Sequence, residues 1–202
     1  MPIKNIVFDM GGVLVDFDPQ KMMSKCIPPE YHSDVNKYCF ESEIWKEMDK
    51  GTVEVEEAVE KMLLNLPECI HSSVRHMIID REEMMPVLPH HTPIIKKLSE
   101  NGYSLFVLSN CPKWFHEFKS VIPLIDRFEG FVVSADYFCR KPDEIIYNIL
   151  FDTFCLKPEE CFFIDDSYLN TRTAEKLGMK AFCYSKNPDE LLSYMNECGI
   201  NI

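Results

Sequence analysis

The sequence lacks the features that mark several large classes of protein. No run reaches about 18 apolar residues, and the first residues show no basic segment followed by an apolar stretch. The nine cysteines include no Cys-x-x-Cys pair, and none of the six histidines has metal spacing to a cysteine. These absences argue against a membrane span, a secretory leader, a disulfide framework and a zinc site. We therefore expect a cytoplasmic globular protein with reduced cysteines.

Positive charge is also scarce. The chain carries 21 Lys and Arg against 33 Asp and Glu, a formal net charge of −12. Such a charge repels polyanions, so neither nucleic acid nor an anionic membrane surface is expected as a partner. A small anionic substrate would need a metal ion, a lysine or backbone amides nearby. Periodicity alone assigns no oligomeric state.

The apolar pattern predicts an α/β fold. Runs of strand-forming residues stand at 3–8, 104–108, 131–134, 161–164 and 181–184, and helical segments alternate with the later runs. This order predicts a Rossmann-like, parallel five-stranded sheet with helices on both faces. Between the first strand and the rest, residues 19–88 show helical periodicity only. We therefore expect a core domain of residues 1–18 and 89–202, with an all-helical cap domain of residues 19–88 inserted after the first strand.

Two threonines in this pattern have the expected chemistry of helix N-caps. Thr52 stands before an apolar helical stripe in the cap, and Thr92 precedes Pro93 in a segment that ends at Gly102. A threonine hydroxyl can accept a hydrogen bond from a free amide in the first turn, and proline is favoured at the first helical position. We expect both residues to begin helices.

Polar residues follow four of the expected strands, at the point where each strand ends. They are Asp9 after the first, Ser109 and Asn110 after the second, Lys141 after the third, and Asp165 and Asp166 after the fourth. Each one alone has an ordinary explanation as a turn, capping or surface residue. Because ligands of open α/β sheets bind at the carboxyl ends of the strands, their common placement predicts one shared site.

Together these side chains supply three carboxylates, a hydroxyl, an amide and an ammonium. Crowded carboxylates repel one another and also repel a phosphate dianion, so the set calls for a hard divalent cation. Mg²⁺ suits it, because this ion takes carboxylate and carbonyl oxygens and keeps several waters. The combination is suited to metal-assisted phosphoryl transfer.

The same motifs carry a family resemblance that covers essentially the whole chain. The motifs are Asp9-Met10-Gly11-Gly12-Val13, Ser109-Asn110, Arg140-Lys141-Pro142 and Asp165-Asp166 with Asn170. In this order the chain resembles the haloacid dehalogenase superfamily, in the branch with a helical cap after the first motif.

The resemblance implies a Mg²⁺-dependent phosphatase acting on a small phosphate ester through an aspartyl-phosphate on Asp9. It implies that Mg²⁺ is held by Asp9, the carbonyl of Gly11 and the late acids, principally Asp166 with Asp165. It further implies that Ser109, the amide of Asn110 and Lys141 hold the phosphoryl oxygens. Asn170 is expected to brace the loop of the fourth motif.

Gly11 departs from the usual pattern. Phosphatases of this family usually carry a second Asp at this position, which acts as general acid and base; a glycine offers a backbone carbonyl but no proton. The pattern resembles a bacterial subgroup with Gly here that acts on hexose phosphates such as glucose 1-phosphate, so a sugar phosphate is expected. Asp16 or Asp18 could supply the acid, although both are more simply turn residues.

Two other functions compete with the phosphatase. A 2-haloacid dehalogenase would use the same aspartate against carbon; those members usually have an aromatic residue at position 11 and need no metal. A catalytically weak binding or regulatory protein would explain the missing acid, but not the retained Asp9, Lys141 and paired late acids. Among the cap residues, Trp45 is the candidate to line the pocket.

Overall fold

The computed structural model describes residues 1–202, apart from the side chains at positions 81 and 82. Its centre is one parallel sheet of five strands in the order β3-β2-β1-β4-β5. The strands are β1 (Asn5–Phe8), β2 (Ser104–Ser109), β3 (Phe128–Val133), β4 (Cys161–Asp165) and β5 (Lys180–Cys183). The expected α/β class and five-stranded parallel sheet are confirmed. β1 is the middle strand, so the residue that follows it stands at the centre of the carboxyl edge.

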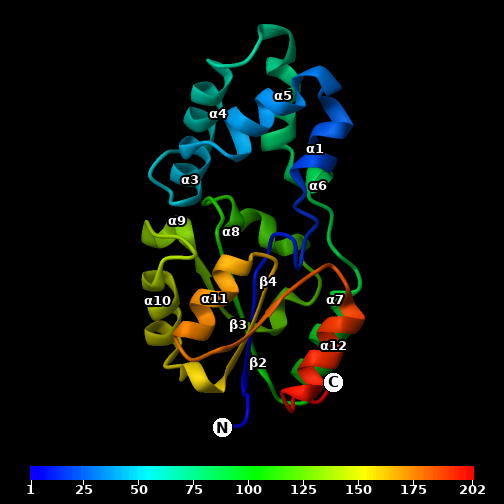
Figure 1. Cartoon of the computed structure of the whole chain (residues 1–202), viewed down its shortest axis with the longest axis vertical. Coiled ribbons are helices and arrows are strands. Elements are labelled where there is room, and N and C mark those ends of the chain that lie inside the picture. Colours follow the sequence, from blue (N-terminus) through cyan, green and yellow to red (C-terminus); the bar gives the residue numbers. More distant parts are fainter.

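Both faces of the sheet are buried, which explains why its strands are apolar without alternation. Ile6 and Phe8 of β1 belong to one hydrophobic cluster, whereas Val7 between them belongs to the other. Helices α7 (His91–Glu100), α8 (Phe115–Phe118) and α12 (Pro188–Glu197) supply the first cluster, and α10 (Glu144–Phe154) and α11 (Tyr168–Lys176) the second. Figure 1 shows α7 and α12 on one side of the sheet and α10 and α11 on the other.

The helical cap stands beyond the carboxyl ends of the strands (Figure 1). Its helices are α1 (Pro19–Cys26), α2 (His32–Val35), α3 (Glu43–Asp49), α4 (Val55–Leu63), α5 (His71–Ile79) and α6 (Arg81–Met84). The amide of Asp16 donates to the carbonyl of Pro86, and the amide of Leu88 donates to that of Leu14. The segments that enter and leave the cap are therefore tied together. The exact division at residues 19–88 stays a prediction.

Local details differ from the sequence expectation at both threonines. α4 begins at Val55, and the Thr52 hydroxyl instead donates to the carbonyl of Glu47, closing the end of the preceding helix. α7 begins at His91, so Thr92 lies inside the first turn. At α7 the residue that begins the helix is held by tertiary packing, since His91 is buried against Tyr184. The third strand also begins three residues earlier than expected, at Phe128.

None of the helices in the part of the chain that the structure describes combines the length and apolar character needed to cross a bilayer.

Candidate active site

A buried lysine joins two of the strand ends. The Lys141 ammonium lies 2.8 Å from Oδ1 of Asp9 and 2.6 Å from Oδ2 of Asp165, and it donates to the carbonyl of Leu108 at 2.7 Å. The side chain of Lys141 is fully buried. Its three protons thus have three oxygen acceptors, as an ammonium out of contact with water requires.

Asn110 holds the backbone of Lys141 in place. The amide of Lys141 donates to Oδ1 of Asn110 at 2.7 Å, and Nδ2 of Asn110 donates back to the Lys141 carbonyl at 2.9 Å. This reciprocal pair links the end of β2 to the loop before α10. The side-chain amide predicted as a phosphoryl ligand is therefore committed to the lysine loop, while Asn110 still lines the cavity above.

Asp165 is saturated with hydrogen-bond donors. Oδ1 accepts from the amide of Ser167 at 2.8 Å and from Nδ2 of Asn170 at 2.9 Å, while Oδ2 accepts from Lys141. Asn170 was expected to brace this loop, and its bond to Asp165 does so. Asp165 is completely buried, whereas the neighbouring Asp166 lines the cavity.

The three carboxylates form a compact group that suits a hard cation. Asp9, Asp165 and Asp166 each present an oxygen within 4.8 Å of the other two. Gly12 makes this approach possible, because a Cβ at that position would lie 2.0 Å from Oδ2 of Asp166. Its φ of +71° is also one that side chains with a Cβ rarely adopt. An all-oxygen donor set of this kind fits Mg²⁺.

The charges of the group act on one another. Burial raises the pKa of Asp9 well above its ordinary value; Lys141 opposes this shift, and the nearby Asp165 and Asp166 add to it. Burial alone would lower the pKa of Lys141, but Asp165 and Asp9 hold it above its ordinary value. The lysine therefore stays charged, and one ammonium does not balance three acids. A divalent cation would supply the missing positive charge.

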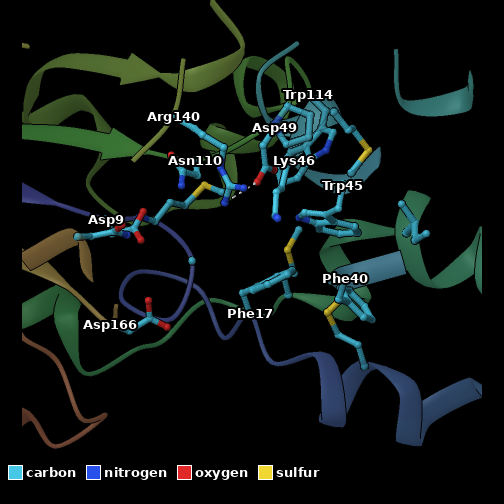
Figure 2. A pocket seen from close by; sticks show the side chains of 18 of the residues that line it. Asp9, Phe17, Phe40, Trp45, Lys46, Asp49, Asn110, Trp114, Arg140 and Asp166 are labelled. Atoms are coloured by element: carbon cyan, nitrogen blue, oxygen red, sulfur yellow. Dashed lines mark hydrogen bonds and ion pairs between the residues drawn. The ribbon is translucent and has the colours of Figure 1, made fainter. Parts of the chain in front are cut away.

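A cavity of about 300 Å³ opens above Asp9, between the core and the cap. Figure 2 shows Asp9 and Asp166 at one end, Arg140, Asp49 and Phe17 nearer the middle, and Trp45 and Phe40 toward the other end. The rings of Phe17, Phe40 and Trp45, here called the aromatic wall, lie in contact, with centroids 4.9 Å apart for Phe40 and Trp45 and 5.9 Å for Phe17 and Trp45. Five methionines complete much of the apolar lining: Met10, Met22, Met48, Met77 and Met85.

Asp49 of α3 brings a buried acid from the cap into this cavity. Its Oδ2 lies 3.4 Å from Nη2 of Arg140, and its side chain is only 6% exposed. Burial raises the pKa of Asp49 to about 7, although Arg140 and Lys141 both lower it. Nε of Arg140 is buried with no hydrogen-bond partner among the described residues.

The structure thus brings Asp9, Asn110, Lys141, Asp165 and Asp166 together at one edge, with Gly11 on the cavity surface. Ser109 is buried at the end of β2 and is not among the described residues that line the cavity. Lys141 and Asp165 lie beneath the cavity rather than on its surface. Trp45, the cap candidate, does line it.

Sequence reasoning missed Asp49, Lys46, Phe17 and Phe40, and it treated Arg140 only as the neighbour of Lys141. One local signal was present, since Asp49 stands four residues after Trp45 and three after Lys46, just before the helix-ending Gly51. Asp16 and Asp18, by contrast, face away into ion pairs with Lys21 and Lys186.

Known proteins resemble this chain in sequence. Residues 6–184 match the profile of the family described as haloacid dehalogenase-like hydrolase. The flavin mononucleotide hydrolase 1 of Arabidopsis thaliana is 23% identical over 172 residues, and the match spans 81% of this chain but only 65% of the plant protein. The D-ribitol-5-phosphate phosphatase of Bacteroides thetaiotaomicron is 25% identical over 198 residues, spanning 89% of this chain and 91% of the relative.

A solved structure agrees in fold. A HAD family enzyme of Bacteroides thetaiotaomicron, in complex with magnesium and inorganic phosphate, superposes with a TM-score of 0.70 at 21% identity. The superposition covers 89% of this chain and 93% of that one. The two proteins therefore have the same fold.

The buried lysine generates a prediction about stability. Lys141→Met leaves the buried carboxylates of Asp9 and Asp165 without their cation, so the free energy of unfolding should fall by about 3–5 kcal/mol at pH 8. The loss should shrink as the pH falls, because the raised pKa of Asp9 lets the folded variant take up a proton.

Urea unfolding at several pH values measures this effect. Lys4→Met is a matched control, because Lys4 lies at the same 2.8 Å from Glu160 but is 59% exposed, and its loss should cost at most about 1 kcal/mol. Equal losses in the two variants would contradict the role assigned to the buried pair.

Proposed function

Since the chain belongs to the haloacid dehalogenase-like hydrolases, we propose that it is a Mg²⁺-dependent phosphatase that hydrolyses a small phosphorylated metabolite. One observation carries the proposal. Asp9 forms an ion pair with the buried Lys141 at the floor of the cavity, and it is grouped with Asp166, whose carboxylate also lines the cavity. The phosphatases among the relatives support the reaction class.

In this proposal Asp9 attacks phosphorus and forms an aspartyl-phosphate, which water then hydrolyses. Lys141 orients the Asp9 carboxylate and counters the rise in its pKa that burial causes. Bound by Asp9, the Gly11 carbonyl and Asp166, Mg²⁺ would supply positive charge against the phosphoryl oxygens. The saturated Asp165 orients Lys141 and the loop that carries Asp166. Arg140 and Asn110 line the cavity where the remaining phosphoryl oxygens would lie.

The substrate class follows from position 11 and from the cavity wall. Gly11 favours an ester whose alcohol leaves easily, such as the anomeric phosphate of glucose 1-phosphate. The D-ribitol-5-phosphate phosphatase among the relatives supports a phosphorylated polyol as a second candidate, although its alkoxide needs a proton. The aromatic wall favours a leaving group with a flat or apolar face, as flavin mononucleotide has.

Two competing functions receive less support. A 2-haloacid dehalogenase has no use for the grouped carboxylates of Asp165 and Asp166, and position 11 lacks the aromatic side chain of those enzymes. In a protein that only binds a ligand, nothing would offset the free-energy cost of grouping three acids around one lysine.

The first test removes the nucleophile. Asp9→Asn keeps an acceptor for the Met10 amide but loses the attacking carboxylate, so phosphate release should fall by at least roughly 10⁴-fold. The measurement is phosphate release from a panel of phosphorylated metabolites and acetyl phosphate, with thermal unfolding to show that the variant folds. Turnover that survives in Asp9→Asn would rule out the covalent route.

A second test concerns the metal. Chelation should stop phosphate release and Mg²⁺ should restore it, while a dehalogenase would be indifferent. Mg²⁺ should also raise the melting temperature of the wild type, because a ligand that binds only the folded state stabilises it.

Gly12→Ala should lose that shift, since its Cβ collides with Asp166. Gly102→Ala is the matched control, because Gly102 also has a positive φ but has no atom within 4 Å of an added Cβ. A Mg²⁺-induced shift that persists undiminished in Gly12→Ala would place the metal elsewhere.

A third test examines the aromatic wall with a matched pair of substrates. Flavin mononucleotide is a ribityl phosphate that carries a flavin ring, so D-ribitol 5-phosphate has the same reacting end without the ring. Trp45→Ala should raise KM for the flavin ester by about 10-fold, the effect of losing roughly 1–2 kcal/mol of ring contact. KM for D-ribitol 5-phosphate should barely change, and an equal change for both esters would contradict contact with the leaving group.

A further inference from the structure

The proposed reaction needs a proton donor that position 11 does not provide. The departing alkoxide of an ordinary phosphate ester must gain a proton, and a positioned acid supplies it in most such reactions. Among the described residues that line the cavity, the carboxyl groups belong to Asp9, Asp49 and Asp166. Asp9 attacks phosphorus and Asp166 faces the metal position, which leaves Asp49.

The two acids that the sequence suggested are poorly placed for this role. Asp16 is paired with Lys21 at 2.6 Å and with Lys186 at 3.0 Å, and those lysines hold its pKa below the ordinary value despite some desolvation. Asp18 caps α1 by accepting from the amides of Gln20 and Lys21. Neither belongs to the cavity lining.

The backbone of Asp49 is fastened to the core although the residue belongs to the cap. The Ser134 hydroxyl donates to the Asp49 carbonyl at 2.5 Å and accepts from the amide of Cys111 at 2.9 Å. Two residues later, Gly51 lies so close to the core that an added Cβ would be 2.4 Å from the carbonyl of Ala135. The end of α3 is thus held against the loops after β2 and β3, where the reacting groups lie.

The side chain of Asp49 points toward the active-site end of the cavity. Its Oδ2 lies 3.4 Å from Arg140, and Figure 2 shows both side chains between Asp9 and the aromatic wall. That is the region a leaving group must cross to connect a phosphorus at Asp9 with the wall. Lys46, one turn earlier, is engaged with Glu43 at 2.5 Å.

We propose that Asp49 is the proton donor to the leaving oxygen, replacing the carboxyl that position 11 lacks. The inference rests on the proposed function. As Asp9 attacks, the bond between phosphorus and the ester oxygen breaks, and that oxygen takes its electron pair and the proton of Asp49. The products are a free alcohol, the aspartyl-phosphate and the Asp49 carboxylate. The carboxylate then accepts a proton from the water that attacks phosphorus, which releases phosphate and Asp9 and restores the acid.

The surroundings of Asp49 are suited to this cycle. The charged groups that act on it are Arg140 and Lys141, both from the core. Burial outweighs the two core cations and places its pKa about 7, so the protonated and ionised forms are both accessible at neutral pH. Arg140 would stabilise the carboxylate formed after proton transfer.

The test separates proton donation from every other role by changing the leaving group. Acetate leaves from acetyl phosphate without needing a proton, whereas the alkoxide of D-ribitol 5-phosphate needs one. Asp49→Asn keeps the shape of the side chain, so it should lower kcat/KM for D-ribitol 5-phosphate, which reports the transfer to Asp9 and not the later hydrolysis, by about 10²–10⁴-fold. Its kcat/KM for acetyl phosphate should equal that of the wild type because this transfer needs no proton, and thermal unfolding shows that the variant folds.

Asp18→Asn is the matched control, since asparagine keeps the helix cap, and both substrates should be unaffected. In the wild type, kcat/KM for D-ribitol 5-phosphate should fall as the pH rises through about 7, where Asp49 loses its proton, and this limb should vanish in Asp49→Asn.

Equal losses of kcat/KM for the two substrates would show a positioning role and overturn the proposal, as would an unchanged kcat/KM for D-ribitol 5-phosphate. If the wild type releases phosphate from neither substrate, the proposed function itself fails, and the proton donor falls with it.

Discussion

The site depends on one buried ammonium. Lys141 has no access to water and meets Asp9, Asp165 and the Leu108 carbonyl within 2.8 Å. A buried charge is tolerated only where its partners are complete, so the ends of β1, β2 and β4 must converge on this point. Other hydrogen bonds hold these partners in place. Asn110 fixes the backbone of Lys141 through two reciprocal bonds, and the donors around Asp165 fix its carboxylate.

The role proposed for Asp9 rests on the negative charge that this ammonium leaves unbalanced. One positive charge faces three grouped carboxylates, and Asp166 remains directed at the cavity. The protein thus retains a local excess of negative charge at the place where an anionic substrate would have to bind. A divalent cation would resolve that conflict, and Gly12 leaves room for the close approach of Asp166 that such a site needs.

The cap adds what the core lacks. It contributes the aromatic wall through Phe40 and Trp45 and a buried acid through Asp49, while Ser134 and Gly51 hold it against the core. Gly11 itself is not demanded by packing, because an added Cβ would meet only Phe17 at 3.4 Å. Packing therefore does not explain why position 11 lacks a carboxyl. Because that carboxyl is missing, the buried Asp49 of α3 is the acid proposed to donate the proton.

The sequence alone determined the sheet, its buried strands and the strand-end residues, because apolar runs and chain order directly reflect burial and parallel topology. It also identified Asp9, Lys141 and Asp165 as a group, although not that Lys141 and Asp165 lie beneath the cavity. Only the tertiary structure decided the role of Thr52 and Thr92, whose helices start where packing places them, and only it brought Asp49 to Arg140. Asp49 and Arg140 are 91 positions apart, and no local sequence pattern predicts their contact. Periodicity reports which face of an element is buried, whereas the partner across an interface is set by how the cap closes on the core.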